Sequence, residues 1–488
     1  MTEPIPDRMP GRTRRAFLWE AGAGFTGLAM IDLLSRDGFF AKQAFATEAA
    51  AKNPLAAKPP HFPAKAKHVV FLFMAGGPSH VDTFDHKPAL ARYDGSSYQG
   101  EVKQVGSNGR PVGNLMKSPF PFRKHGQSGL EISSLYPNVA RFADDLCVIR
   151  SLHTDTAAHG SGVVQMNTGS VVIGKPSLGS WVSYGLGSTQ ESLPAFVVMP
   201  DARGGPVAGA SNWSAGFMPA TFQGTVFRAA GSPLLDLSNP DGVSTPAQRR
   251  VLDLLNDLNR QHLGARPGES ELAARIDSYE LAYRMQSTAS EVVAIEKEDA
   301  RTKDLYGLGD PRTADFGRRC LITRRLIEKG VRFIQLYSGD SAGNTTWDGH
   351  IDCIGNHQLH AGETDKPIAA LIQDLKRTGL WEDTLLIWGG EFGRTPTSEG
   401  LGLTGRDHNW HGFSMWIAGG GVKGGQALGA TDELGFKAAE DPYHVADLHA
   451  TILHLMGLDY SKLTYFYQGL DQKLTGQRAC APILKALA

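Results

Sequence analysis

The chain has 488 residues, and its 49 Lys and Arg against 50 Asp and Glu leave a formal net charge of -1. This balance argues against bulk nucleic-acid binding, which needs an excess of positive charge over one face. The four cysteines form no Cys-x-x-Cys pair, so the sequence also argues against a disulfide scaffold, a zinc ribbon and a thioredoxin-like redox motif. The length suits about three average domains or one large α/β domain with insertions.

The first fifty residues have the features of an export signal. A twin arginine at 14–15 stands directly before an apolar pair, and a Gly- and Ala-rich apolar run follows over 21–34. Residues 44–46 then offer an Ala-x-Ala cleavage site. We therefore predict a twin-arginine signal peptide over 1–46, the twin-arginine translocase as a partner during export, and a periplasmic or secreted location. An amphipathic N-terminal helix with a chance arginine pair is the alternative.

The apolar run is too often interrupted to cross a membrane. Glu20 and Asp32 break it, so no stretch of about 18 uncharged apolar residues exists, and no stable membrane span is expected. Residues 47–66 are rich in Ala, Lys and Pro, which is typical of a linker.

Past the linker, apolar runs bounded by Gly and Pro alternate with segments of helical period. This pattern is typical of a mostly parallel sheet with helices on both faces. We therefore expect an α/β fold, a three-layer α/β/α sandwich, over 67–488, with two polar helical segments inserted as a cap at about 245–300. The strands are expected at 68–74, 146–150, 196–199, 331–337, 384–388 and 413–418, and helices around 318–329, 368–375 and 444–456.

Chemistry in such folds collects at the carboxyl ends of the strands, and metal-ligand residue types follow several of these runs. Asp82 follows the first strand, and Asp348 and His350 follow the strand expected at 331–337. Carboxylates and imidazoles in such loops can reach one cation beside the sheet. The alternative is that Asp82 caps a turn and Asp348 caps the next helix.

Two further loops strengthen this hypothesis. Glu391 and Arg394 follow the strand expected at 384–388, where Glu391 supplies a carboxylate and Arg394 could clamp an anion, unless the two form an internal ion pair. Asp407 and His408, with His411 in reserve, come directly before the strand at 413–418. Adjacent Asp and His followed by another His is the most specific cluster in the chain, although surface loops contain such triples by chance.

A helix that opens near His159 follows the strand expected at 146–150. Its N-terminus would offer backbone N–H groups to an anion, and His159 or a hydroxyl of Thr154, Thr156 or Ser161 could act as nucleophile or ligand. Ordinary capping by Thr156 is the alternative. Together, these loops describe a metal-assisted site for an anionic ester substrate. Mixed carboxylate and imidazole sets suit Zn²⁺ and Mn²⁺, and Ca²⁺ where carboxylate and water dominate.

Five runs carry a likeness to a known family: 76–85, Trp347-Asp348-x-His350, 390–396, 406–409 and 418–421. They resemble the bacterial domain of unknown function 1501 family, in the family's order and over nearly everything past the signal. That family resembles a branch of the alkaline phosphatase and sulfatase superfamily, which implies a three-layer sandwich with metal ligands at the strand ends.

The chain departs from the superfamily pattern at two points. Glu391 stands where Asp is usual and Phe392 where His is usual, so Asp407 and His408 are expected to supply the missing ligands. No cysteine lies in a Cys-x-Pro-x-Arg motif, and the resemblance aligns His159 with the nucleophile, so a formylglycine nucleophile is not expected.

The resulting hypothesis is an exported, metal-dependent hydrolase of phosphate or sulfate esters, with no further cofactor. A non-catalytic metal-binding or assembly protein with the same fold is the competing class. The expected metal ligands are Asp82, Asp348, His350, Glu391, Asp407 and His408, and the expected catalytic residues are His159 and Arg394.

Overall fold

The structure is a computed structural model that describes residues 53–98, 113–228, 239, 242–265, 270–341, 345–400 and 402–488. The expected signal peptide over 1–46 lies outside the described residues. The chain divides into two compact units, Met1–Ala56 and Ala57–Ala488. The architecture described below is that of the second unit.

A nine-stranded sheet forms the centre of this unit, in the order β12-β4-β11-β8-β1-β7-β5-β6, with β15 also paired to β4. Only β11 runs antiparallel to its neighbours, β4 and β8, and every other pair in the sheet is parallel. The strands are β1 (His68–Met74), β4 (Leu146–His153), β5 (Phe196–Met199), β6 (Thr225–Val226), β7 (Phe333–Ser338), β8 (Thr384–Gly389), β11 (Phe413–Gly419), β12 (Gln426–Leu428) and β15 (Tyr443–His444).

The central strands are apolar on both faces because helices cover both faces. β1 reads His-Val-Val-Phe-Leu-Phe-Met and is buried from its second residue onward. It pairs in parallel with β7 on one side and with β8 on the other, and Val69 lies level with Phe333 and Leu385. A continuous apolar run was therefore the right signal for a central parallel strand.

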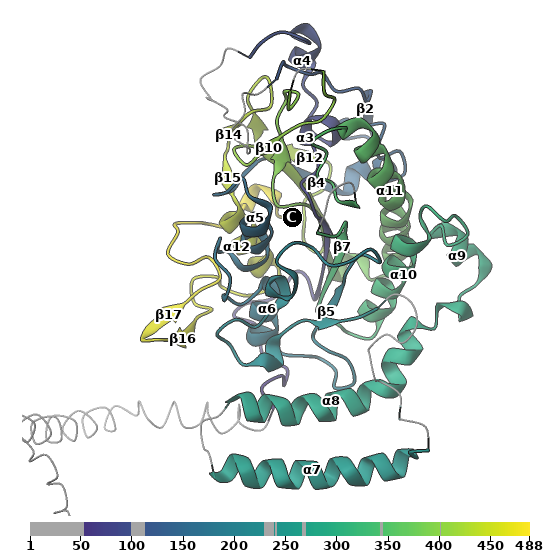
Figure 1. Cartoon of the computed structure of the whole chain (residues 1–488), viewed down its shortest axis with the longest axis vertical. Helices are drawn as coiled ribbons and strands as arrows, with labels where there is room; N and C mark the ends of the chain where they lie inside the picture. Colours follow the sequence, from purple (N-terminus) through teal and green to yellow (C-terminus); the bar gives the residue numbers. More distant parts are fainter. Residues whose placement is uncertain are drawn as a thin grey trace, which may run out of the picture. The chain divides into compact units, whose positions relative to one another are not determined.

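Helices form one layer on each side of the sheet (Figure 1). One layer holds α10 (Ala314–Glu328) and α11 (Cys353–Arg377), and the other holds α5 (His159–Thr168), α6 (Leu178–Leu186) and α12 (Val445–Leu455). The expected three-layer α/β/α sandwich with a mostly parallel sheet is confirmed. Among the described residues, no helix has both the length and the apolar character that crossing a bilayer requires.

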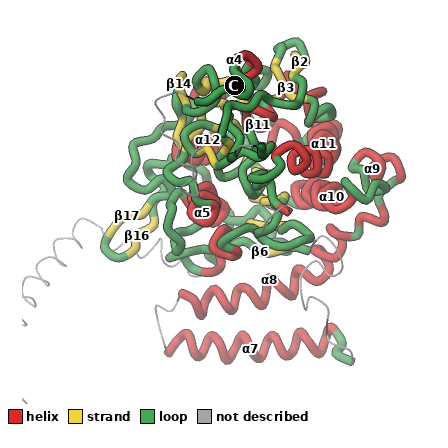
Figure 2. The backbone as a smooth tube through the Cα atoms, turned by 45° about the horizontal axis from the view of Figure 1, so that its top comes forward, coloured by secondary structure: helices red, strands yellow, loops and turns green. Residues whose placement is uncertain are grey.

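The expected helical insertion is present as two long helices, α7 (Thr245–Ala265) and α8 (Ser270–Val293). They lie side by side, and α7 is the outer of the two in Figures 1 and 2. Arg249 of α7 joins them through an ion pair with Glu280 of α8 at 2.7 Å.

Part of the segment expected as a linker packs onto the sandwich instead. The Lys58 N–H donates to the Leu186 carbonyl oxygen at 3.0 Å, and the Lys65 and Ala66 N–H groups both donate to the Leu455 carbonyl oxygen. The second unit correspondingly begins at Ala57. These backbone hydrogen bonds hold the segment against the sandwich. The Ala- and Pro-rich composition gave no sign of them, because backbone groups of any residue can form such bonds.

Shorter elements complete the described chain. The remaining helices are α3 (His80–Thr83), α4 (Pro88–Arg92) and α9 (Ala300–Leu305), and 3₁₀ turns include Val139–Asp145, which directly precedes β4. The remaining strands pair as hairpins or short ladders: β2 (Phe122–His125) with β3 (Leu130–Ser133), β9 (Gly393–Arg394) with β10 (His408–Asn409), β13 (Ala430–Thr431) with β14 (Ala438–Glu440), and β16 (Tyr465–Tyr467) with β17 (Leu470–Gln472).

Candidate metal centre

Five loops meet at one edge of the sheet because of the strand directions. β1, β4, β7 and β8 all end at this edge, and antiparallel β11 begins there, with Phe413 paired to Leu152. The loop after β4 leads to His159, the loop after β7 carries Asp348 and His350, and the loop before β11 carries His408. Residues up to 249 positions apart in the sequence are therefore brought to one place.

Four side chains converge there as a group that could hold a metal ion. His159, Asp348, His350 and His408 each offer one ligand atom, and these atoms lie within 4.8 Å of one another. Asp348 is at the centre: its Oδ1 lies 3.1 Å from His159 Nε2, 2.9 Å from His350 Nε2 and 3.3 Å from His408 Nε2. His350 Nε2 and His408 Nε2 are themselves 2.9 Å apart.

The opposite nitrogen of each imidazole is fixed by an oxygen acceptor. Nδ1 of His159 lies 2.6 Å from Glu391 Oε1, and Nδ1 of His350 lies 2.6 Å from Glu399 Oε2. Nδ1 of His408 lies 2.6 Å from the Ala157 carbonyl oxygen. Because carboxylate and carbonyl oxygens only accept, each Nδ1 must donate its hydrogen. In the neutral ring, Nε2 then carries the lone pair, which is how metal-binding histidines are usually oriented.

Four of the six separations within the group match a single coordination sphere, and the other two are no longer than 4.8 Å. Zinc binds imidazole nitrogen at about 2.0–2.1 Å, so neighbouring ligand atoms in a tetrahedron lie about 3.3 Å apart. The atoms in this group that contact one another are separated by 2.9–3.3 Å. Three imidazoles and one carboxylate suit Zn²⁺, Mn²⁺ and other transition metals better than Ca²⁺, which prefers six to eight oxygen ligands.

Protons balance the charge of the group in the absence of a metal. Burial alone would lower the pKa of His159, but its hydrogen bonds to Asp348 and Glu391 raise it to about 9. Burial and the positive charge of Arg394 lower the pKa of His408 to about 4. Burial alone would raise the pKa of Asp348, yet Arg394 and the three imidazoles hold it well below its usual range. At neutral pH Asp348 is therefore ionised, His159 is protonated and His408 is neutral.

Arg394 is turned toward the protein and not toward solvent. It is fully buried, and its Nε donates to the Gly77 carbonyl oxygen at 2.9 Å. Its Nη1 donates to the Arg406 carbonyl oxygen, and its Nη2 donates to the Gly76 carbonyl oxygen and to Asp348 Oδ1. The guanidinium expected to clamp a substrate anion thus positions Asp348 in this structure.

Asp82 and Asp407, both expected as ligands, stand outside the group. The Asp82 carboxylate accepts from Arg406 Nε at 2.7 Å and from the Ser79 hydroxyl at 2.6 Å. Burial alone would raise the pKa of Asp82, but the Arg406 guanidinium lowers it. Asp407 Oδ1 accepts from the backbone N–H of His408 at 2.7 Å and so supports the loop that presents this ligand. His411, the further candidate ligand, packs its ring against that of Trp410, with the ring centroids 4.4 Å apart.

Glu391 lies behind His159 and not in the group itself. It is fully buried, and its Oε1 also accepts from the backbone N–H of Gly76 at 2.9 Å. Gly76 has a φ of 110°, and a Cβ there would lie 2.6 Å from the Asp348 backbone nitrogen. A glycine at this position therefore allows the loops after β1 and β7 to approach closely.

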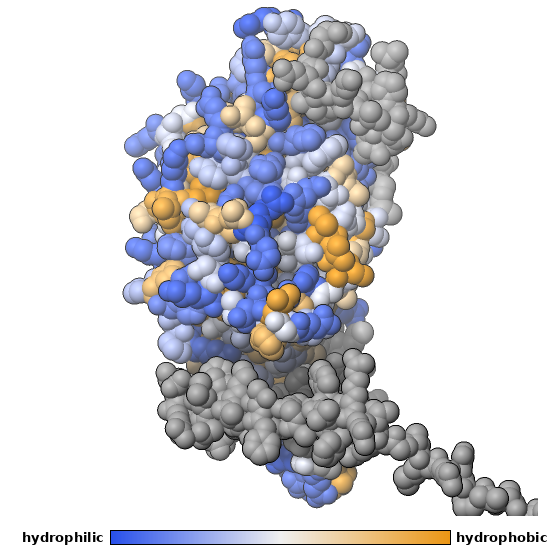
Figure 3. All heavy atoms as spheres, turned by 90° about the vertical axis from the view of Figure 1, so that its left-hand side faces the viewer, coloured by the Kyte–Doolittle hydropathy of each residue, from blue (hydrophilic) through white to orange (hydrophobic). Residues whose placement is uncertain are grey.

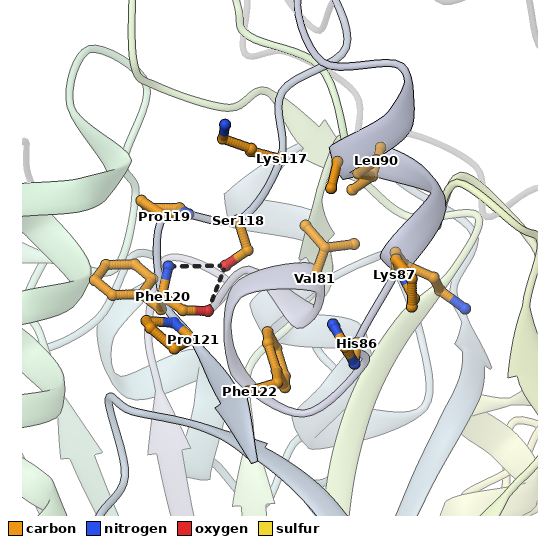
Figure 4. Close-up of a pocket in the computed structure, with 12 residues that line it drawn as sticks. Val81, His86, Lys87, Leu90, Lys117, Ser118, Pro119, Phe120, Pro121 and Phe122 are labelled. Carbon is orange, nitrogen blue, oxygen red and sulfur yellow. Dashed lines mark hydrogen bonds between the residues drawn. The ribbon is translucent and has the colours of Figure 1, made fainter.

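Two cavities lined by described residues are candidates for a substrate site. One of about 30 Å³ is lined by His159, Asp348, Glu391, Gly76 and Thr346 among others, and its volume suits one water molecule. A second, of about 220 Å³, contains no member of the group and is lined by Val81, five residues between His86 and Ala91, and residues 117–122 (Figure 4).

The larger cavity offers no free positive charge to an anion. Lys87 pairs with Asp85 at 3.1 Å, and Lys117 pairs with Asp94 at 3.3 Å. The Ser118 hydroxyl is engaged by the backbone of Phe120, as the dashed lines in Figure 4 show. The candidate site is therefore the group around Asp348.

The sequence predicted Asp348, His350 and His408 as metal ligands, and it predicted His159, the fourth member, as a catalytic residue. It missed the oxygen partners Glu399 and Ala157, which lie in a Ser-Glu-Gly turn and a Thr-Ala-Ala turn. Nothing in either turn marks a ligand-orienting residue, because a backbone carbonyl has no sequence signal and an acidic residue in a polar turn is common.

Several solved structures are similar to the chain at low identity. The lipoteichoic acid synthase LtaP from Listeria monocytogenes has 11% identity and a TM-score of 0.35, covering 88% of this chain and 80% of that one. The sulfatase PsFucS1 from Pseudoalteromonas sp. has 12% identity and a TM-score of 0.34, covering 91% and 77%. The alkaline phosphatase from the Antarctic bacterium TAB5 has 11% identity and a TM-score of 0.34, covering 81% and 99%.

A search of curated proteins found no match to this sequence. A family signature matches residues 66–485, which is most of the chain and all of the sheet. The chain therefore belongs to the family described as "Protein of unknown function (DUF1501)".

Proposed function

We propose that this protein binds a divalent metal ion through His159, Asp348, His350 and His408 and hydrolyses phosphate or sulfate esters at that site. The observation that carries the proposal is the convergence of three imidazole Nε2 atoms on one carboxylate oxygen, with every Nδ1 atom fixed by an oxygen acceptor. Zn²⁺ and Mn²⁺ are the ions that the donor set favours.

The partial exposure of the group supports a reactive site over a purely structural one. The side chains of His159, Asp348 and His350 are 19%, 21% and 26% exposed. Catalytic zinc sites keep a position that water or substrate can reach, and some bind a fifth ligand during the reaction. With four protein ligands in place, the exposed side of this group would offer water that fifth position. A bound ion would supply Lewis acidity, which polarises the ester and lowers the pKa of a water molecule.

The chain's own residues would orient the reaction. Glu391 holds the Nδ1 proton of His159, and Arg394 holds Asp348. Hydrolysis adds water across the ester bond, so the acid anion leaves with one oxygen from water and the alcohol leaves with a proton. The small cavity beside Glu391 has room for that water.

One observation favours a second candidate, a metal-binding protein without catalysis. The cavity that touches the group is about 30 Å³, and Arg394 is engaged by the protein, so no free cationic side chain of this cluster faces a substrate anion. Such a protein would bind metal tightly and turn over no ester.

The two candidates are separated by activity of the metal-loaded protein. Aryl phosphate, phosphodiester and aryl sulfate substrates would be assayed with Zn²⁺- and Mn²⁺-loaded protein, with His408→Ala as the test variant and His411→Ala as the matched control. Turnover that is lost with chelator and with His408→Ala, but kept with His411→Ala, supports the hydrolase. Stoichiometric metal with no turnover on any ester supports the binding protein.

We also propose that the protein is exported by the twin-arginine pathway. The support is the order of Arg14 and Arg15, the apolar run and the Ala-x-Ala box in the sequence. The test is a pulse-chase of the full chain with Arg14→Lys and Arg15→Lys together. Accumulation of uncleaved cytoplasmic precursor is expected, and unchanged processing would contradict the proposal.

A further inference from the structure

The outer cap helix exposes a continuous apolar stripe. On α7, Val251, Leu254, Leu255 and Leu258 are 56%, 61%, 39% and 52% exposed. Their spacing of three, four and seven positions places them on one face of the helix. Other exposed apolar side chains, such as Val172 and Phe466, lie in a loop and a short hairpin, and the face in Figure 3 is largely hydrophilic with separate hydrophobic patches.

The face of the same helix that packs against the protein is mostly polar, although it includes the partly buried Leu252. Asn256 is only 4% exposed, and its side-chain amide donates to Glu280 of α8. Arg249 pairs with Glu280 at 2.7 Å and with Asp253 at 2.6 Å. A surface helix normally turns its apolar stripe to the core. Here polar contacts hold α7 on α8, and the stripe is left on the outer side of the cap.

A bilayer is not the occupant that the composition of α7 favours. Helices that lie in a membrane interface are rich in Lys and Arg on the polar face and carry aromatic residues on the other. α7 has three arginines against two aspartates and no aromatic residue. A protein surface with the same mixture of leucines and paired charges fits better.

The charges beside the stripe fit a second copy of this chain. Arg250 and Asp257 are seven positions apart, so they lie on the same flank of the stripe, and both are exposed. In an antiparallel pair related by a two-fold axis, residues on one flank face the same flank of the partner. Arg250 then meets Asp257 of the second copy, and the contact occurs twice. The existing Asp257–Arg260 pair is long, at 3.6 Å, and both side chains are about two-thirds exposed.

We propose that α7 is a dimerisation helix whose apolar stripe packs antiparallel against the same stripe of a second copy. The apolar side chains supply the buried surface, and the two Arg250–Asp257 pairs set the antiparallel direction. This proposal does not depend on the metal centre, because α7 contributes no residue to it.

A charge-exchange experiment on the full chain tests the proposal, with molecular mass measured by sedimentation equilibrium over about 1–100 µM. The wild type is expected to show a monomer–dimer equilibrium. Leu254→Glu is expected to abolish the dimer, and Arg250→Asp or Asp257→Arg alone is expected to weaken it at least about tenfold, because like charges then face each other. The double variant R250D/D257R is expected to restore dimerisation to within about threefold of the wild type.

Arg123→Asp, on exposed strand β2, is the matched control and should leave the equilibrium unchanged. Circular dichroism would confirm that each variant is folded. A wild-type monomer throughout the concentration range overturns the proposal, as does a dimer that ignores the charge exchange. If the wild type is a monomer that binds lipid vesicles and Leu254→Glu does not bind them, lipid covers the stripe. If the wild type is a monomer and the Tm of Leu254→Glu is lower, another segment of the same chain covers the stripe.

Discussion

His350 and His408 bring their Nε2 atoms to within 2.9 Å of each other, while their Nδ1 atoms point away to Glu399 and to the Ala157 carbonyl. Since both Nδ1 atoms donate, two lone pairs face each other unless a proton or a cation lies between them. Asp348 Oδ1 adds a negative charge beside both rings. A cation is therefore the species that this arrangement stabilises best.

Metal content should depend on the three histidines of the group. His159→Ala, His350→Ala and His408→Ala are each expected to lose stoichiometric metal, because each variant removes one of the four ligands. Elemental analysis after dialysis measures the content, and His411→Ala is the control. Chelator should also lower the Tm of the wild type, since an ion that binds only the folded state stabilises it. Metal retained in all three variants would contradict the assignment.

Glu399 should tune the affinity of the site without contributing a ligand. Its carboxylate holds Nδ1 of His350 at 2.6 Å. Glu399→Ala removes this acceptor and is expected to weaken metal binding about 10–100-fold, the usual effect of removing such an orienting partner. Competition with a chromophoric chelator would measure the affinity. An unchanged affinity would contradict this orienting role of Glu399.

Asp82 should matter for stability and not for metal. Its carboxylate is buried and paired with buried Arg406 at 2.7 Å. Asp82→Asn leaves the guanidinium without a buried counter-charge and is expected to cost about 3 kcal/mol or more of unfolding free energy, with metal stoichiometry unchanged. Lys67→Ala breaks the exposed Lys67–Asp383 pair and should cost below about 1 kcal/mol. Chemical denaturation gives both values, and loss of metal in Asp82→Asn would return this residue to the site.

Stability should fall as the pH falls below about 6.5. Burial lowers the pKa of His449 to about 4, and its Nε2 donates to the Met166 carbonyl oxygen. The unfolded chain binds this proton near its ordinary pKa, so protons favour unfolding between the two pKa values. The loss from this residue reaches about 3 kcal/mol at pH 4 and is absent above pH 7.

The measurement is the unfolding free energy at a series of pH values, with His449→Gln for comparison. Glutamine keeps a donor for the Met166 carbonyl oxygen but does not titrate. The slope between pH 6.5 and 4 should therefore be smaller in the variant. Buried His357, whose pKa burial lowers to about 3, should keep part of the slope in both proteins. Identical slopes would contradict a buried neutral His449.

Gly76 should be far less tolerant of a side chain than another glycine that has a positive φ. A Cβ at Gly76 meets the Asp348 backbone nitrogen at 2.6 Å, whereas a Cβ at Gly95, which has a φ of 78°, meets nothing within 4 Å. Gly76→Ala is expected to displace the Asp348 loop and reduce metal affinity. Gly95→Ala is expected to lower the unfolding free energy by only about 1 kcal/mol, because its Cβ is strained by the positive φ but meets no neighbour. Metal titration and thermal unfolding of the two variants check this difference.

The sequence by itself determined the layers of this protein. Continuous apolar runs such as 68–74 and 384–388 are strands that must be buried on both faces, and the polar helices near 249–263 and 271–298 interrupt them as an insertion. It also determined which loops carry ligand types, because Asp348, His350 and His408 lie in loops that follow or precede such runs. These properties depend on neighbouring residues in the chain, so a local pattern reveals them.

Only the tertiary structure decided which polar groups meet. Asp82 and Arg394 satisfied the same sequence criteria as Asp348 and His408, yet Asp82 faces Arg406 and Arg394 faces backbone carbonyls. His159 joins the group from a helix 189 positions before Asp348. Such pairings follow from the order in which strands lie in the sheet, and strand order is fixed by packing between distant segments, which leaves no trace in local sequence.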